Sequence, residues 1–254
     1  MRLAEKTAIT FRHERWRAVS AGILETAANT FLLIIAVRWF HAGSTSKALV
    51  AGGGSFGLFL TPIVVTQVAR SGWTASKAAA ALAIFGAALF VLMAALPVLP
   101  LFVVGSLLGM AAASGAVPLF THIYHENYPE KERGQLFSST VMIRIATAAV
   151  FSEMAGRFLF ANISYFRWLL IIFAAAFAFA AYHLKRCPSS PIPHDEGAHP
   201  FRALRFVKTD RVLRMTLIAW MLMGLANLMM LPMRVEYLAN PKYGLNLSVV
   251  EVAF

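Results

Sequence analysis

Seven long apolar stretches, separated by polar segments, dominate the chain. A helix needs roughly 20 apolar residues to cross the hydrocarbon core of a bilayer, and each stretch has about that length. The region Ala78–Thr121 carries no charged residue at all. The pattern predicts an all-α, polytopic membrane protein whose transmembrane helices cover Val19–Phe40, Ala48–Val68, Ala78–Leu96, Leu99–Ile123, Leu136–Phe160, Phe166–Leu184 and Val212–Leu231.

The spacing of these stretches divides the chain into three parts. Residues 1–184 form a six-helix bundle with short connections, and residues 185–211 form a linker rich in Pro, Ser and charge, which favours a flexible segment. Residues 212–254 contain the seventh helix, and Leu247–Phe254 resembles the start of an eighth. We therefore expect a bundle followed by the truncated beginning of a second one.

Composition supports the membrane assignment. The chain is 59% hydrophobic and 14% charged, whereas soluble domains are nearer 25% charged. The net charge of +11 could indicate nucleic acid, but the basic residues concentrate in residues 1–17, in the second and fourth loops and in the linker. The positive-inside rule then predicts a multi-pass protein of the cell (inner) membrane with a cytoplasmic N-terminus. Its expected partner is the lipid bilayer and not nucleic acid.

Local sequence around the fourth helix resembles a transporter family. Small residues fill 109–118, and Tyr128-Pro129 leads to Arg133-Gly134 before the fifth helix. Basic residues also precede Ala28-Asn29 in the first helix and Ala226-Asn227 in the seventh. Together with six helices and a basic linker, this is similar to the N-terminal half of the major facilitator superfamily (MFS) plus one helix. The resemblance implies twelve helices around a central cavity and rocking halves that alternate access.

One family signature is only partly present. Between the second and third helices the family has Gly-x-x-x-Asp-Arg-x-Gly-Arg-Arg; here only Arg70 and Gly72 match it. The resemblance makes Arg70 and Gly72, with Arg133 and Gly134, candidates for loops that control conformation. It identifies no subfamily and therefore no substrate.

Two charges lie deep inside apolar helices, where ionisable groups are costly and mark pathways. Glu25 and Asn29 are four residues apart and are expected to share a helix face. Arg144 follows Gly134 by ten residues, or about 15 Å along a helix, and the family places the two helices side by side. We predict a buried Glu25–Arg144 ion pair at a cavity wall. Arg144 would hold an anionic solute while Glu25 takes up a proton; a purely structural pair is the alternative.

Other polar positions support weaker predictions. Ser114 lies with Ser106, Met110 and Thr121 at helical spacing, which fits a cavity face and helix packing equally well. Asn227 is a binding candidate because it matches Asn29. Two further motifs have structural interpretations: Gly53-x-x-x-Gly57 predicts close helix packing, and Glu153 with Arg157 predicts an ion pair along one helix face.

These features favour a secondary transporter of a small solute, with proton coupling as one option. The alternative is a non-transporting membrane remnant or a half-bundle that acts as an interaction protein. If the chain is complete, transport requires a homodimer. The sequence offers no nucleophile–base pair and no metal-ligand set, so we expect no enzyme activity, no cofactor and no metal site.

Overall fold

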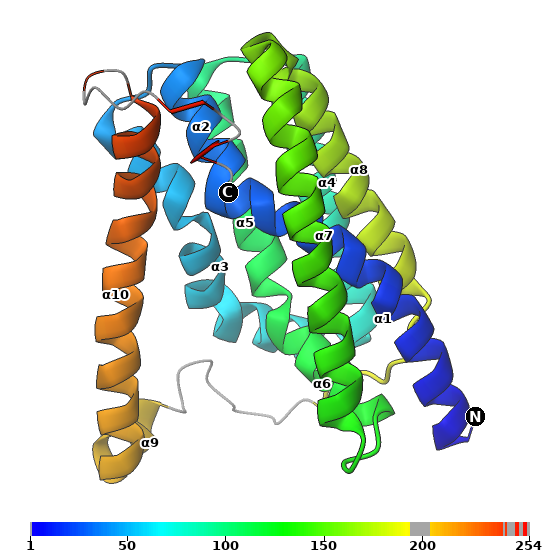
Figure 1. Cartoon of the computed structure of the whole chain (residues 1–254). Helices are drawn as coiled ribbons and strands as arrows, with labels where there is room; N and C mark the ends of the chain where they lie inside the picture. Colours follow the sequence, from blue (N-terminus) through cyan, green and yellow to red (C-terminus); the bar gives the residue numbers. More distant parts are fainter. Residues whose placement is uncertain (1, 194–203, 241, 243–246, 249–250, 253–254) are drawn as a thin grey trace.

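The protein is an all-α, polytopic membrane protein (Figure 1). The computed structural model describes residues 2–193, 204–240, 242, 247–248 and 251–252. Within these residues, seven helical spans are long and apolar enough to cross a membrane, as predicted. The spans are α1–η1–α2 (Leu3–Thr26, Ala27–Phe31, Leu32–Arg38), α3 (Ser44–Ser71), α4 (Ala75–Ala95), α5–α6 (Leu99–Gly115, Val117–Asn127), α7 (Arg133–Ala161), α8 (Phe166–Lys185) and α10 (Arg211–Ala239).

The first span begins much earlier than its hydropathy indicates. We expected the transmembrane helix to start at Val19, but α1 is already helical at Leu3. The polar first half is held by side-chain contacts to the end of α6: Lys6 pairs with Glu126 at 3.2 Å, and Asn127 donates a hydrogen bond to Thr10. Tertiary contacts therefore extend a helix that hydrophobicity alone does not predict.

A π-helical turn interrupts this first span. Residues Ala27–Phe31 form η1 between α1 and α2. A π turn inserts one extra residue into an α-helix and is often found at functional sites. Beyond it, Leu32–Ala36 are almost completely buried in the bundle core. The turn thus separates the part of the span that carries Glu25 from the part that packs in the core.

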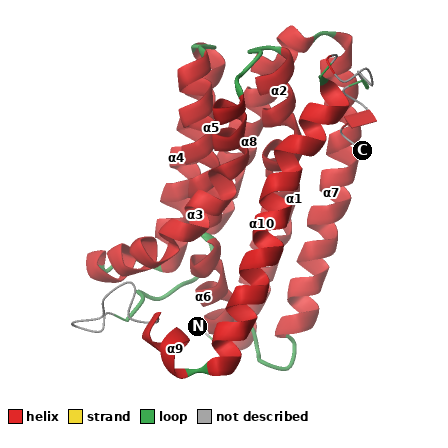
Figure 2. Cartoon of the chain, turned by 90° about the vertical axis from the view of Figure 1, so that its left-hand side faces the viewer, coloured by secondary structure: helices red, strands yellow, loops and turns green. Residues whose placement is uncertain are grey.

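The main helix pairs are α1 with α7, α3 with α5, and α4 with α8. Small residues allow the α3–α5 contact to be close: a Cβ atom on Gly57 would lie 2.2 Å from the carbonyl oxygen of Ala111, and one on Gly53 would lie 2.9 Å from Met110. The predicted packing role of Gly53-x-x-x-Gly57 is confirmed. Figures 1 and 2 show α10 at the edge of the bundle, where it packs against α2 and α3.

The ends of the predicted linker agree with the structure to one residue. Helix α8 ends at Lys185 and α10 begins at Arg211, with the short helix α9 (Leu204–Thr209) between them. The start of the linker is not a free chain, because the backbone and hydroxyl of Ser190 both donate hydrogen bonds to Glu126. Much of the remaining linker, and half of the expected eighth helix at Leu247–Phe254, lies outside the described residues.

Candidate functional site

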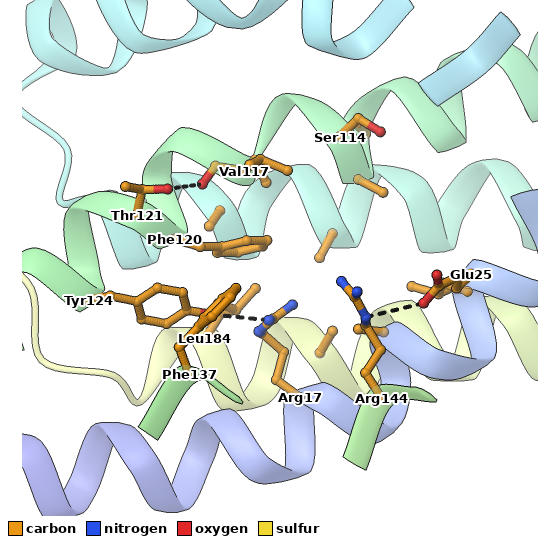
Figure 3. A pocket seen from close by; sticks show the side chains of 18 of the residues that line it. Arg17, Glu25, Ser114, Val117, Phe120, Thr121, Tyr124, Phe137, Arg144 and Leu184 are labelled. Atoms are coloured by element: carbon orange, nitrogen blue, oxygen red, sulfur yellow. Dashed lines mark hydrogen bonds and ion pairs between the residues drawn. The ribbon is translucent and has the colours of Figure 1, made fainter. Parts of the chain in front are cut away.

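A cavity of about 830 Å³ opens among α1, α4, α5, α6, α7 and α8 (Figure 3). Its space comes from alanine: Ala21, Ala28, Ala79, Ala83, Ala112, Ala113 and Ala180 all line it. Phe120, Tyr124, Phe137 and Phe177 add aromatic surface. The volume lies within the range of roughly 300–1,000 Å³ that is usual for small-molecule sites.

Glu25 and Arg144 meet on the wall of this cavity. Arg144 Nε lies 3.2 Å from Glu25 Oε2, so the predicted ion pair is confirmed. The prediction that the pair is buried is wrong, because the side chains of Arg144 and Glu25 are 42% and 38% exposed. The small residues around them keep the cavity open at this point. The pair therefore faces a space that a solute can enter.

The contact between Glu25 and Arg144 leaves bonding capacity unused. Nε and Oε2 are each shielded from solvent, and neither makes a hydrogen bond within the described part of the chain. Figure 3 shows the two terminal nitrogens of Arg144 directed away from Glu25 into the open space. The guanidinium thus keeps its outer edge available for another acceptor.

For the four residues of the fourth span, the sequence left open whether they line a cavity or pack between helices. Met110, Ser114 and Thr121 line the cavity. Ser106 is completely buried and lies 3.9 Å from the sulfur of Met93, which makes it a packing residue. The break between α5 and α6 falls at Ala116, two residues beyond Ser114, and Ala116 also lines the cavity.

The two asparagine candidates lie away from this cavity. Asn29 is exposed within η1 and is not among the lining residues, so it does not stand beside Glu25 on the cavity wall as expected. Its side chain is on the exposed surface of the span, whereas the following residues Thr30 and Phe31 are buried. Asn227 is exposed on α10 and also lies outside the lining. A binding role for either residue has no support from this cavity.

Two of the four loop candidates lie at the mouth of the cavity. Arg133 and Gly134 belong to its lining, and Arg133 donates hydrogen bonds to the carbonyl oxygens of His125 and Tyr128. Gly72 ends α3 with a positive φ of 67°, a conformation that favours glycine. Arg70 is exposed. Their role in conformational change remains a prediction.

Sequence reasoning missed a buried polar cluster below the ion pair. Glu14 and Arg17 of α1 pair with each other, and Tyr124 of α6 hydrogen-bonds to both. The side chains of Glu14 and Arg17 are only 4% and 15% exposed, and the Arg17 guanidinium lies 4.3 Å from the Phe120 ring centroid. The available signal was the i, i+3 spacing of opposite charges, which lies in the basic segment before the predicted first transmembrane helix.

The cluster influences two neighbours outside the spans. Burial raises the pKa of the Cys187 thiol to about 12, and the Glu14 carboxylate acts in the same direction. Burial likewise raises the pKa of Tyr128 above its usual value. Cys187 was expected in an open loop, but it is 6% exposed. Both groups therefore stay neutral at physiological pH.

No protein-family model, curated protein or solved structure matches this chain. The chemistry of the cavity is thus the main guide to function. It combines an open, mostly apolar space with the Glu25–Arg144 pair among the spanning helices, and further charged residues such as Glu130 and Arg133 also line it. Such a site can bind a small solute through charge and apolar contact.

Proposed function

We propose that this chain is a secondary transporter of a small solute, of the MFS type, that works by alternating access. The observation that carries the proposal is the Glu25–Arg144 pair, exposed to a cavity of about 830 Å³ among the spanning helices. Ionisable groups within spans are expensive and commonly mark solute or ion pathways. A cavity without ionisable groups could equally hold lipid or result from imperfect helix packing.

In this proposal Arg144 binds an anionic solute. Glu25 balances the Arg144 charge when the site is empty and takes up a proton when the solute binds, which couples the two movements. Arg70 and Gly72 at the end of α3, and Arg133 and Gly134 at the start of α7, flank the connections that change as access to the site alternates between the two sides. The chain resides in the inner membrane with its N-terminus in the cytoplasm, as its basic residues indicate.

Solute counterflow in proteoliposomes tests the proposal. Vesicles containing the full chain are loaded with unlabelled phosphate, lactate or benzoate, and uptake of the labelled anion is followed. We expect the chain to take up at least one of these anions. The single variants Arg144→Ala and Glu25→Gln should each lower that uptake at least tenfold. Arg157→Ala is the matched control, because Arg157 pairs with Glu153 on the same helix but is 74% exposed and outside the cavity. Normal uptake by both cavity variants would refute the proposal.

A second function rests on α10. This helix packs against α2 and α3, and its described apolar side chains are largely exposed. A half-bundle that binds another membrane protein, or a second copy of itself, would use such a face. Counting subunits in native membranes by single-molecule photobleaching, together with counterflow, separates the two functions: an oligomer without counterflow favours the interaction protein.

A further inference from the structure

Within the described part of the chain, Arg144 is the cavity arginine whose two terminal nitrogens both lack a hydrogen-bond partner. Arg17 donates through Nε and one terminal nitrogen to Glu14 and Tyr124. Arg133 lies at the mouth and donates to two backbone carbonyls. Arg144 contacts Glu25 through Nε alone, and its terminal nitrogens face the cavity (Figure 3). Because a guanidinium binds carboxylates best through two parallel hydrogen bonds, the cavity offers one bidentate anion site.

The surroundings of this site are apolar. Much of the lining is alanine and phenylalanine, including Ala113, Phe120, Phe137 and Phe177, and Ser114 and Thr121 add two hydroxyl groups. A strongly hydrated anion such as phosphate would lose its water against these walls without replacement hydrogen bonds, which is costly. An anion with an apolar body would instead bury that body favourably.

Glu25 also limits the charge of the ligand. Its carboxylate stays 3.2 Å from Arg144 Nε, so a ligand at the outer edge meets a cation that is already partly neutralised. A second negative charge on the ligand would be repelled by the Glu25 carboxylate for as long as that group is ionised. The site therefore suits a single negative charge.

We propose that the cavity binds an amphipathic monoanion, whose carboxylate lies on the outer edge of Arg144 and whose apolar or aromatic body packs against the alanine and phenylalanine walls. This inference rests on the proposed transport function only for its physiological meaning, because binding is measurable without transport. Such an anion can come from the aqueous phase, as an aromatic carboxylate, or from the bilayer, as a fatty acid.

Binding of 2-naphthoate to the full chain in lipid nanodiscs, followed by isothermal titration calorimetry, tests the inference. The neutral 2-naphthalenemethanol lacks the charge, while acetate and phosphate lack the apolar body. We expect each of the three to bind at least tenfold more weakly than naphthoate. Oleate added to the bilayer distinguishes the two sources: displacement of naphthoate at low mole fraction identifies a lipid-borne anion, and no displacement identifies a soluble one.

Three variants locate the probe. Arg144→Ala is expected to weaken naphthoate binding at least tenfold, and Arg157→Ala to leave it unchanged. Ala113→Leu fills the cavity without touching a charge and is expected to weaken naphthoate binding as well, which keeps the test valid if Arg144→Ala does not fold. Equal binding of phosphate and naphthoate, or naphthoate binding that ignores Arg144 and Ala113, would overturn the inference.

Failure of this inference and failure of transport are distinguishable. Counterflow of phosphate or lactate without naphthoate binding would support the transport proposal and refute the proposal of an amphipathic ligand. Naphthoate binding that depends on Arg144, without counterflow of any anion, would support the proposed ligand class and refute the transport proposal.

Discussion

Gly22 of α1 lies directly against the backbone of Arg144 in α7: a Cβ atom on Gly22 would come within 2.4 Å of the Arg144 carbonyl oxygen. Glu25 lies one helical turn after Gly22 on the same face. The close approach of the two backbones therefore sets the distance at which the Glu25 carboxylate meets the Arg144 guanidinium. A residue without charge thus determines the geometry of the charged pair.

Gly22→Leu is expected to destabilise the protein. The side chain would collide with a backbone carbonyl that cannot rotate away, and overpacking of this kind costs roughly 1–3 kcal/mol. Thermal unfolding in detergent measures the effect. Gly52→Ala is the control, because Gly52 also lies inside a helix but a Cβ there would meet nothing within 4 Å. Equal melting temperatures for the two variants would contradict the close contact.

Glu14→Gln is expected to be strongly destabilising, because it leaves the largely buried Arg17 without a counter-charge. Breaking one partner of a buried pair costs about 3–5 kcal/mol, whereas Tyr124→Phe removes one hydrogen-bonding group at about 1 kcal/mol. The melting temperatures of the two variants show whether Glu14→Gln is the more destabilising substitution. The double variant Glu14→Leu with Arg17→Met should recover much of the loss; if it is worse than Glu14→Gln, the cluster has a different energetic basis.

Alkaline pH is expected to destabilise the fold through Cys187. The unfolded thiol loses its proton near pH 9, whereas the folded thiol has a pKa of about 12. Between these values the folded state binds more protons, so its stability is full below pH 9 and falls as pH rises. The slope is at most about 1.4 kcal/mol per pH unit. Melting temperatures at pH 8, 9 and 10 measure it, and Cys187→Ala should flatten the curve.

Single-cysteine labelling tests the proposed orientation. In a Cys187→Ser background, Lys131→Cys is placed in the α6–α7 connection and Asn162→Cys after the opposite end of α7; both positions are exposed. A membrane-impermeant maleimide added to intact cells should label residue 162 only, and lysis should allow labelling of residue 131. The reverse pattern would place the N-terminus outside, because Figure 1 shows it at the same end of the bundle as the α6–α7 connection.

Helix number and the ion pair could be predicted from sequence because both depend on strong local signals. Apolar stretches such as 78–121 require burial in lipid, and a lone charge inside such a stretch requires a partner. Glu25 and Arg144 were the obvious candidates, and the structure joins them. Their exposure could not be predicted, because it depends on the sizes of residues from four other helices that meet around them.

The missed features share a different cause. The helical start of α1 and the Glu14–Arg17–Tyr124 cluster depend on contacts with α6, more than 100 residues away. A window that moves along the chain cannot register such contacts. The π turn was also missed, because no residue type in Ala27–Phe31 marks it.

The π turn uncouples the orientation of the two halves of the first span. A π turn is equivalent to a one-residue insertion that a regular helix has absorbed. The turn therefore makes the rotational position of the residues before it, such as Gly22 and Glu25, independent of that of the residues after it, such as Leu32–Ala36. A change in the rotation of the cavity-facing half can therefore be absorbed in the turn, and Leu32–Ala36 remain directed into the core.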